Sequence, residues 1–342
     1  MMRLVKSCHR AVEYQTDELM SVSVSIAESY REVRRISRRS GSNFYRSFWL
    51  LPKQKRNAMC ALYAFARITD DLGDCDQPVA LRTHWLEWWR QTLALNFVDN
   101  DDPNTVLFAD QRPEEQASWK IDVPSFAARI IPALRDAHRC YQIPKRYFLE
   151  ITDGVLADQQ KTRFDTYEQL EHYCYLVASA IGLACLHIWG FDELPEKPAV
   201  DCGLAFQLTN ILRDVSEDAA RGRIYLPRQH YELHGLCEDD LLKPRPDDRL
   251  RCLIEDEVER AIALYNSGWK IWDSLGPDGK PMFSMMWRTY RRLLDHIAAD
   301  PRSVATRRVT LSRKEKFGLV SRHFIPPLYR ALPVPPAEVS SP

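Results

Sequence analysis

The sequence predicts an all-α fold. Apolar residues recur at helical spacing through most of the chain, strand-like alternation is nearly absent, and only 12 of the 342 residues are glycine. The length allows one large domain or two ordinary ones, each with a sizeable apolar core. Because 45% of the residues are hydrophobic, a disordered chain is excluded.

Helical patterns follow one another along the chain. The first, from Pro52 to Asp74, places Ala58, Leu62 and Phe65 on one face. Further helices are predicted, in chain order, at 123–140, 145–156, 166–190, 199–219, 247–275 and 282–299. The stretch 96–113 (NFVDNDDPNTVLFADQRP) is rich in Asn, Asp and Pro and therefore predicts a long surface loop.

The chain divides into a main domain at 40–300 and two flanking segments. Residues 1–39 are polar and predict a loosely ordered helical arm. The basic run from Arg31 to Arg39 is interpreted as a solvated face, with steering to an anionic membrane as the alternative. Residues 301–342 are expected to form a mobile, proline-rich tail.

Composition narrows the function classes. The 47 Lys and Arg residues balance 47 Asp and Glu residues, which gives no electrostatic reason to expect a nucleic-acid partner. The nine cysteines are scattered without a C-x-x-C pair, so we expect neither a disulfide framework nor a zinc cluster, and mostly buried thiols. No stretch has the 18 apolar residues of a membrane span, and the N-terminus lacks a secretory signal. The expected location is the cytoplasm, with peripheral contact at the inner membrane face left open.

Two helices carry ladders of acidic residues. In the first, Asp70 and Asp74 are four residues apart, so they share one face of the helix. In the second, Asn210, Asp214 and Asp218 follow the same step. Like charges at this spacing destabilise a helix by a few tenths of a kcal/mol, on the order measured for such pairs, and Asp is a poor helix former.

These ladders point to a bound cation. Carboxylate and amide oxygens suit Mg²⁺, which bridges to substrate phosphates. Arg67 and Arg213 stand close to the ladders, and arginine recognises phosphate oxygens bidentately. A single Asp ladder is more often a solvated face, but two ladders with arginines favour a magnesium–diphosphate site.

The sequence resembles the squalene/phytoene synthase family. Three motifs carry the resemblance: YAFARITDDLGD at 63–74, YCYLVASAIGL at 173–183 and AFQLTNILRDVSEDAARGRIYLP at 205–227. The segment SNFYRSFWLLP at 42–52 is similar to the family's N-terminal motif. The resemblance covers about residues 40 to 297.

The resemblance implies an isoprenoid-synthase-type helical bundle with a central cavity, prenyl diphosphate substrates and Mg²⁺-dependent head-to-head condensation. The implied metal ligands are Asp70, Asp74, Asn210, Asp214 and Asp218. The implied catalytic residues are Arg67, Tyr173, Arg213 and Tyr290. The implied substrate-binding residues are Asn43, Arg67, Val177, Gly182, Gln207, Arg213, Arg221 and Tyr225.

The chemistry follows from these groups. Mg²⁺ and arginine stabilise a departing pyrophosphate, and the allylic cation that remains must be shielded from water. The small residues of 177–189 suit a cavity wall that leaves room for a polyisoprenoid tail.

Three functions remain open. The first expectation is a prenyltransferase that joins two farnesyl diphosphates to presqualene diphosphate. The second is a phytoene synthase that joins two geranylgeranyl diphosphates. The third is a catalytically silent assembly subunit, against which the intact ladders argue. Substrate chain length, a reductive second step and the oligomeric state are not set by the sequence.

Three further features have other interpretations. Many relatives carry an acidic residue between Asp153 and Asp158, where Leu156 stands here, so proton handling in that segment is an open question. His230 and His234 are four residues apart and are interpreted as a surface pair rather than as metal ligands. The group Trp85, Trp88 and Trp89 is expected to pack in the core, with lipid contact as the alternative.

Overall fold

The structure is a computed structural model, and it describes residues 21–40, 45, 47–97, 103–110, 123–160 and 162–323. The described chain is mostly helical, as predicted. The helices are α1 (Ile26–Arg39), α3 (Lys53–Asp74), α4 (Val79–Asn96), α5 (Val123–Tyr141), α6 (Lys145–Gln160), α7 (Tyr167–Cys174), α8 (Ala180–Trp189), α9 (Glu196–Ala220), α10 (Arg228–Leu233), α11 (Glu238–Leu242), α12 (Asp248–Trp269), α13 (Ile271–Ser274), α14 (Lys280–Ala299) and α15 (Arg313–His323). Short elements complete the fold: β1 (Ser21–Ser23), η1 (Phe48–Leu50), β2 (Thr105–Leu107), the π-helical turn η2 (Tyr175–Ser179) and η3 (Pro301–Ala305).

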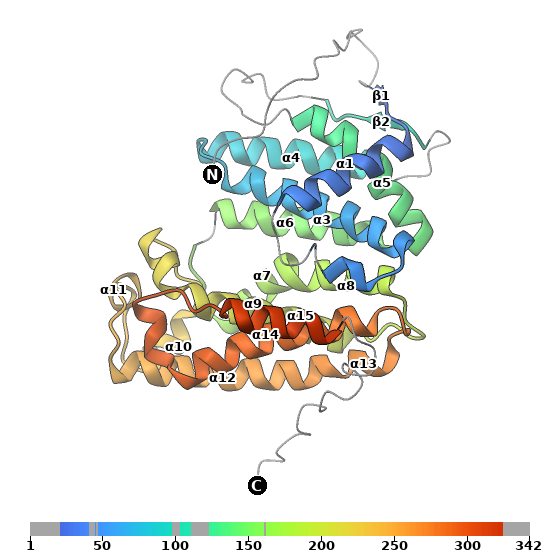
Figure 1. Ribbon diagram of the computed structural model, residues 1–342. Helices are drawn as coiled ribbons and strands as arrows, with labels where there is room; N and C mark the ends of the chain where they lie inside the picture. The colour runs from blue at the N-terminus through green and yellow to red at the C-terminus, as the bar shows by residue number, and fades with distance from the viewer. Residues whose placement is uncertain are drawn as a thin grey trace.

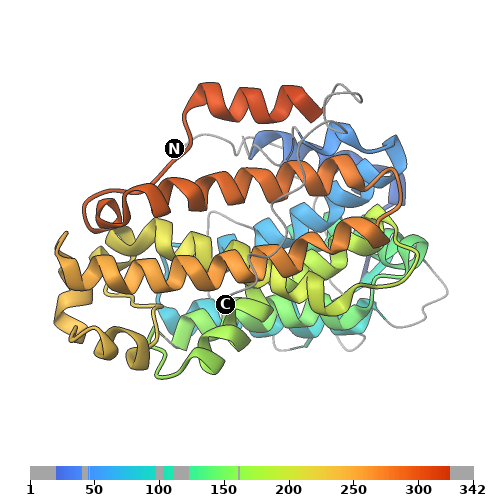
Figure 2. The same cartoon turned by 90° about the horizontal axis from the view of Figure 1, so that it is seen from below.

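The helices form two groups with a third segment between them. One group contains α1, α3, α4, α5 and α6, and the other contains α9, α12, α14 and α15 (Figure 1). The segment α7–η2–α8 packs against α6 on one side and α9 on the other. Seen from below, α12 and α14 run side by side and α15 lies along α14 (Figure 2). This arrangement encloses the apolar faces of α3, α8 and α9.

The three tryptophans of α4 lie in the core, which confirms the first interpretation of the sequence. Trp85, Trp88 and Trp89 are each at most 2% exposed. Trp89 Nε1 donates a hydrogen bond to Thr69 Oγ1 on α3 at 3.0 Å, and Trp88 Nε1 donates to the carbonyl of Ala109 at 3.1 Å. The N–H groups of Trp88 and Trp89 are therefore satisfied inside the protein, and because all three rings are buried, lipid contact is not needed to explain them.

The N-terminal segment differs from the loosely ordered arm that the sequence predicted. Residues 1–20 lie outside the described residues, but α1 packs against α3 and α5, and its Val33 is fully buried. Ser25 caps the helix by accepting a hydrogen bond from Glu28 N at 3.3 Å. The polarity of α1 misled the prediction, because its outer face carries ion pairs such as Arg35–Glu32, while its buried face combines Val33 with the small serines Ser29 and Ser37, whose hydroxyls donate to backbone carbonyls.

The predicted surface loop at 96–113 also contains ordered structure. Its described part forms β2, which pairs antiparallel with β1 in the register Ser21↔Leu107, and Val106 is fully buried. Asn96 holds this turn: its side-chain amide donates to Leu107 O at 2.6 Å, and its Oδ1 accepts from Leu107 N at 3.0 Å. A composition typical of loops therefore concealed a two-stranded sheet that depends on a distant partner.

The single helix predicted at 166–190 is interrupted. The π-helical turn η2 separates α7 from α8, and such turns are frequent at functional sites. Tyr167–Trp189 is long and apolar enough to cross a membrane, but 56% of its apolar window is buried in this bundle, as in a core helix. Its apolar character is therefore accounted for by its place between α6 and α9.

The predicted C-terminal tail begins later than expected. Residues 301–323 contain η3 and α15, and α15 packs on α14. Glu315 accepts hydrogen bonds from Arg292 and His296 of α14 at 3.1 and 2.8 Å, which ties the two helices together. The proline-rich residues 324–342 lie outside the described residues.

Candidate active site

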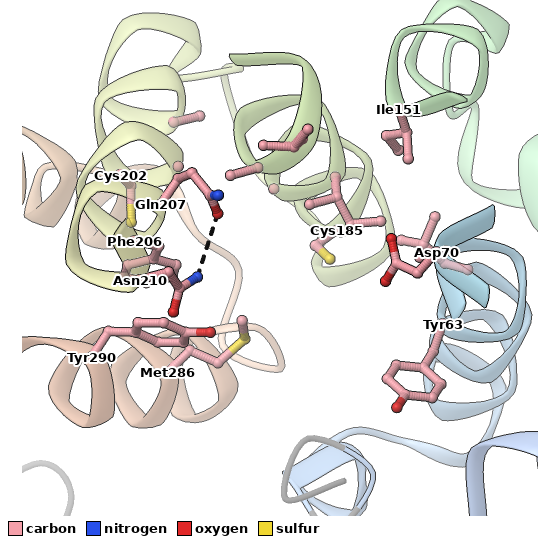
Figure 3. A pocket seen from close by; sticks show the side chains of 18 of the residues that line it. Tyr63, Asp70, Ile151, Cys185, Cys202, Phe206, Gln207, Asn210, Met286 and Tyr290 are labelled. Atoms are coloured by element: carbon pink, nitrogen blue, oxygen red, sulfur yellow. Dashed lines mark hydrogen bonds between the residues drawn. The ribbon is translucent and has the colours of Figure 1, made fainter. Parts of the chain in front are cut away.

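A cavity of about 610 Å³ lies between the two helix groups. Its walls come from α3 and α6 on one side and from α9 and α14 on the other, with the η2–α8 segment between them. Asp70 and Tyr63 project into it from one wall, and Asn210, Gln207 and Tyr290 from the opposite wall (Figure 3). The cavity is therefore built from segments that are more than 200 residues apart in sequence.

One end of the cavity is acidic. Asp70 and Asp74 reach it from the last turns of α3, and Asp214 and Asp218 from the last turns of α9. Carboxylates at helix C-termini face the negative end of the helix dipole, so this placement adds to the repulsion between them. Such an arrangement is unfavourable without a cation, which supports the prediction made from the two ladders.

The raised pKa values of two carboxyl groups at this end also indicate that the aspartates repel one another. Burial and the nearby charge of Asp74 raise the pKa of Asp70 to about 7. Burial and the charge of Asp214 raise the pKa of Asp218 to about 6. Asp70 is surrounded by protein, but its side chain is open to the cavity, so solvent screens part of this effect.

Asn210 supplies a buried oxygen with no partner. Its Nδ2 donates a 3.4 Å hydrogen bond to Gln207 Oε1, while its Oδ1 is buried and accepts no hydrogen bond from the described residues (Figure 3). An unpaired buried acceptor costs about 1–3 kcal/mol unless something else satisfies it. A hard cation does so, and the ligand set of carboxylates plus one amide oxygen fits Mg²⁺.

The acidic side chains do not form a closed metal cage by themselves. Among the described residues there is no group of three or more His, Cys, Asp or Glu side chains placed to hold one ion. The four aspartates stand instead as two pairs on opposite helices. This is the arrangement expected when Mg²⁺ takes one or two carboxylates and completes its shell with water and substrate phosphate oxygens.

Arginines flank the acidic end. Arg213 lines the cavity and pairs bidentately with Asp214, with Nε–Oδ1 at 2.8 Å and Nη2–Oδ2 at 2.5 Å. Arg308, from the segment between η3 and α15, also contacts Asp214 Oδ1 at 2.9 Å and Glu217 Oε2 at 3.3 Å. Arg67 lies outside the lining residues and pairs with Asp71 at 2.6 Å.

An acidic–aromatic cluster lies beside the carboxylates. Tyr225 OH donates to Asp158 Oδ1 at 3.1 Å, and Tyr173 hydrogen-bonds within the same group. The rings of Tyr173 and Tyr225 stack at 5.5 Å, with Phe164 against both. Burial raises the pKa of Tyr173 well above its usual range, so its phenol stays neutral and keeps its proton.

The rest of the cavity is mostly apolar. Val177, Gly182 and Gln207 line it, as the sequence predicted for substrate-binding residues. A Cβ at Gly182 would meet nothing within 4 Å, so the missing side chain leaves open space in the wall. Gly203 serves a different purpose, because a Cβ there would lie 2.5 Å from Ser179 Cα and would push α9 away from η2.

Comparisons with known proteins agree with this geometry. Residues 37–315 match the model of the squalene/phytoene synthase family. The chain belongs to this family. It is 31% identical over 306 residues to a 15-cis-phytoene synthase from a Synechocystis species (85% of this chain, 83% of the relative). It is 32% identical over 295 residues to a phytoene synthase from Mycobacterium tuberculosis (85% and 89%).

Solved structures of related enzymes share the fold. A dehydrosqualene synthase in complex with ligand matches with a TM-score of 0.70 and 26% identity, covering 87% of this chain and 96% of that one. The squalene synthase HpnC from Alicyclobacillus acidocaldarius matches with a TM-score of 0.68 and 26% identity, covering 80% and 94%. Squalene/phytoene synthases are head-to-head prenyltransferases that act on prenyl diphosphates, typically with a divalent metal. The isoprenoid-synthase fold expected from the sequence is thereby confirmed.

The structure brings most of the predicted site residues of this squalene/phytoene synthase into one cavity. These are Asp70, Asp74, Tyr173, Val177, Gly182, Gln207, Asn210, Arg213, Asp214, Asp218, Tyr225 and Tyr290. Arg67 and Arg221 do not line it, and Arg221 is exposed next to Asp218. Asn43 lies outside the described residues.

Three charged residues at the site were not assigned a role from the sequence. Asp158 lines the cavity, and its charge acts on both Asp70 and Asp218. Arg223 faces the same acidic group, and Arg308 arrives from a segment expected to be a tail. The sequence did contain a signal for Asp158. Asp158 ends the segment 153–158, in which many relatives carry an acidic residue where Leu156 stands here, and Leu156 itself does not line the cavity.

The histidine pair lies away from the site and is not a surface pair. His230 is 9% exposed, hydrogen-bonds to the fully buried Glu257 and stacks on Tyr167 at 5.8 Å. His234 contacts Asp256 instead, with Nε2–Oδ2 at 3.0 Å.

Four of the eight described cysteines are buried free thiols, Cys60, Cys174, Cys185 and Cys202, and two of these, Cys185 and Cys202, line the cavity.

Proposed function

We propose that this protein is a phytoene synthase, which joins two molecules of geranylgeranyl diphosphate head to head with the aid of Mg²⁺. The names of the relatives support this choice, because the two enzymes described above are phytoene synthases that cover 85% of the chain. The first expectation from the sequence, farnesyl diphosphate as substrate, has weaker support from structures at 26% identity.

The depth of the cavity is consistent with the longer substrate. Asp214 at the acidic end and Ala199 at the apolar end are fifteen residues apart on the uninterrupted helix α9, about 22 Å at about 1.5 Å per residue. An extended chain advances about 1.2 Å per bond, so a geranylgeranyl chain spans about 18 Å and a farnesyl chain about 13 Å. The longer tail fills the apolar end, whereas the shorter one leaves part of it empty.

The observation that carries the proposal is the polarity of this cavity, which is acidic at one end and apolar at the other. Asp70, Asp74, Asn210, Asp214 and Asp218 would hold Mg²⁺, which when bound neutralises charge on the pyrophosphate leaving group. Arg213 and Arg308 would exchange their contacts with Asp214 for phosphate oxygens as the carboxylate turns to the metal.

The aromatic cluster has a separate role in the proposal. When the C1–O bond of one substrate breaks, pyrophosphate leaves with the electron pair and an allylic cation remains. The rings of Tyr173 and Tyr225 offer their π faces to this cation and exclude water from it. The double bond of the second substrate attacks the cation, and loss of a proton closes a cyclopropane ring.

The overall reaction needs no reductant. Two C20 diphosphates yield one C40 hydrocarbon, two pyrophosphates and two protons, so atoms and electrons balance without hydride transfer. Presqualene diphosphate, the product first expected from the sequence, also forms without a reductant, with loss of one pyrophosphate and one proton. The two assignments therefore differ in the length of the substrate and not in electron balance.

Product analysis tests the proposal. Purified protein is incubated with Mg²⁺ and either geranylgeranyl or farnesyl diphosphate, with an EDTA-treated control, and the lipid is identified by mass spectrometry. A C40 hydrocarbon formed with higher kcat/KM than any C30 product supports the proposal. Preference for farnesyl diphosphate would restore the first expectation, and no product from either substrate would favour a silent assembly subunit.

A cytoplasmic location with peripheral contact at the inner membrane face remains part of the proposal. Because its substrates and product are hydrophobic, membrane contact has a chemical rationale. Fractionation of cells into soluble and membrane portions tests it.

A further inference from the structure

The apolar end of the cavity is closed by residues from several helices. On the helix hairpin α8–α9, α8 ends at Trp189 and α9 begins at Glu196, so the cavity-lining residues Trp189 and Ala199 lie at the same end. Both are buried, Trp189 at 4% and Ala199 at 3% exposure. Ile271 and Met282 close the same region from α13 and α14.

The lining residues of α7, η2 and α8 form a graded wall. Tyr173 lies at the acidic end, and Val177, Ile181, Cys185 and Trp189 follow at four-residue steps, so each stands about one helical turn deeper than the last. One turn is about 5.4 Å, and one isoprene unit adds four main-chain bonds, about 5 Å when extended. Each turn of this wall therefore corresponds to about one isoprene unit of a bound tail.

Trp189 is held firmly at the bottom of this wall. Lys55 Nζ donates a hydrogen bond to the Trp189 carbonyl at 2.8 Å and pairs with Asp278 at 3.1 Å. A Cβ at Gly279 would lie 2.7 Å from Trp189 Cβ, so the neighbouring turn packs directly on the tryptophan. The next residue, Gly190, has a φ of +87° and ends the helix. The backbone and Cβ of Trp189 are therefore fixed at the end of the cavity, next to the partly exposed Lys55–Asp278 pair.

We propose that Trp189 sets the maximum length of the prenyl tail. This inference rests on the proposed function of the cavity and adds the residue that selects the substrate within it. The Trp189 indole fills the layer that the next isoprene unit would occupy. Its Nε1 is buried and has no hydrogen-bond partner among the described residues, so the ring acts through its volume.

The opposite wall offers a second position for the same test. Ala199 stands one helical turn deeper than Gly203 on α9, at the level of Trp189. A larger side chain at Ala199 narrows the apolar end of the cavity, where the last isoprene unit meets the Trp189 layer. Enlarging Ala199 and shrinking Trp189 are therefore expected to shift chain-length preference in opposite directions.

The experiment compares relative kcat/KM for C15, C20 and C25 allylic diphosphates in competition. Trp189→Ala is expected to raise the C25:C20 ratio by about tenfold or more, since a hydrophobic pocket discriminates about 10–200-fold for each small group that it excludes. Trp189→Leu carries the test if the alanine variant does not fold. Ala199→Leu is expected to lower the C20:C15 ratio by a similar factor.

Two further variants complete the series. Trp189→Phe keeps an aromatic ring but removes the pyrrole part of the indole, so its C25:C20 ratio is expected to lie between those of the unmodified protein and of Trp189→Ala. His187→Leu changes the same helix end at a residue outside the cavity lining, which packs on Tyr147 and Phe191, and is expected to leave the ratios unchanged.

The ratios decide the inference independently of the proposed function. If the unmodified protein prefers C15 substrates, the phytoene assignment fails, but Trp189→Ala must still shift preference toward longer chains. Unchanged ratios in a folded Trp189→Ala or Trp189→Leu variant overturn the role of Trp189, whichever substrate is preferred. A shift of equal size in His187→Leu also overturns it, because the effect would then come from the helix end as a whole.

Discussion

Tyr225 OH donates a hydrogen bond to Asp158 Oδ1 at 3.1 Å, and this bond connects the two sides of the acidic end of the cavity. Asp158 comes from α6 and Tyr225 from the segment after α9, and the charge of Asp158 acts on Asp70 as well as Asp218. Burial raises the pKa of Asp158, while the hydrogen bond from Tyr173 lowers it. The pair therefore orients two tyrosine rings next to the proposed metal site.

Asp158→Asn is expected to reduce kcat about tenfold to hundredfold with a smaller change in KM, because it loosens the orientation of Tyr173 and Tyr225 at the reacting carbon. Steady-state kinetics with the preferred diphosphate measures both constants. Asp153→Asn is the matched control: it lies on the same helix, outside the cavity lining, and pairs with Arg90 at 2.5 Å. Equal losses in both variants would count against a role for Asp158.

Asp70→Asn is expected to abolish turnover while leaving the fold intact. The substitution removes a metal-binding carboxylate but also removes charge repulsion with Asp74, so the unfolding midpoint of the metal-free protein should not fall. Asp71→Asn, whose carboxylate pairs with Arg67 outside the cavity, should retain activity within about fivefold, as expected for an exposed ion pair. Activity in Asp70→Asn comparable to Asp71→Asn would refute the metal assignment.

Stability without metal should fall as the pH rises from about 4 to 7. The folded pKa values of Asp70 and Asp218 are raised to about 7 and about 6, so in this window the folded state binds more protons than the unfolded state. The midpoint temperature of thermal unfolding, measured in EDTA from pH 4.5 to 8, checks this dependence on pH. Asp70→Asn combined with Asp218→Asn should make the midpoint less dependent on pH. Mg²⁺ with pyrophosphate should raise the midpoint most above pH 7. A midpoint that rises with pH in EDTA would contradict this account.

Arg308→Gln is expected to raise KM for the prenyl diphosphate about tenfold, since Arg308 supplies charge beside Asp214 and Glu217. The neighbouring Arg307→Gln is the control, because Arg307 is 72% exposed and pairs only loosely with Asp300 at 3.8 Å. Inorganic pyrophosphate binding measured by calorimetry with Mg²⁺ provides a readout that does not depend on turnover. Identical affinities in the two variants would remove Arg308 from the site.

Gly203→Ala should destabilise the protein by about 1–3 kcal/mol, as overpacking does, because its Cβ would meet Ser179 Cα at 2.5 Å. Gly182→Ala meets nothing within 4 Å and should stabilise the helix by up to about 1 kcal/mol. Denaturant unfolding measures both. The reverse order of stabilities would show that α9 does not approach η2 as closely as described.

The sequence alone determined the helical fold, the two acidic ladders and the motifs of the family. These are local properties: a four-residue step places Asp70 with Asp74, and Asp214 with Asp218, on one helix face wherever the helix lies. Spacing within a single helix also placed Trp85, Trp88 and Trp89 on one face, which the structure shows to be buried.

Only the tertiary structure decided how these helices meet. Several features depend on contacts between segments far apart in the chain. They are the positions of α1 and β2, the position of Asp158 beside both ladders, the approach of Arg308 to Asp214 and the closure of the cavity by Trp189. Periodicity within one segment carries no information about its distant partner. Polar composition was misleading at α1, where one buried face was enough to fix the helix in the core.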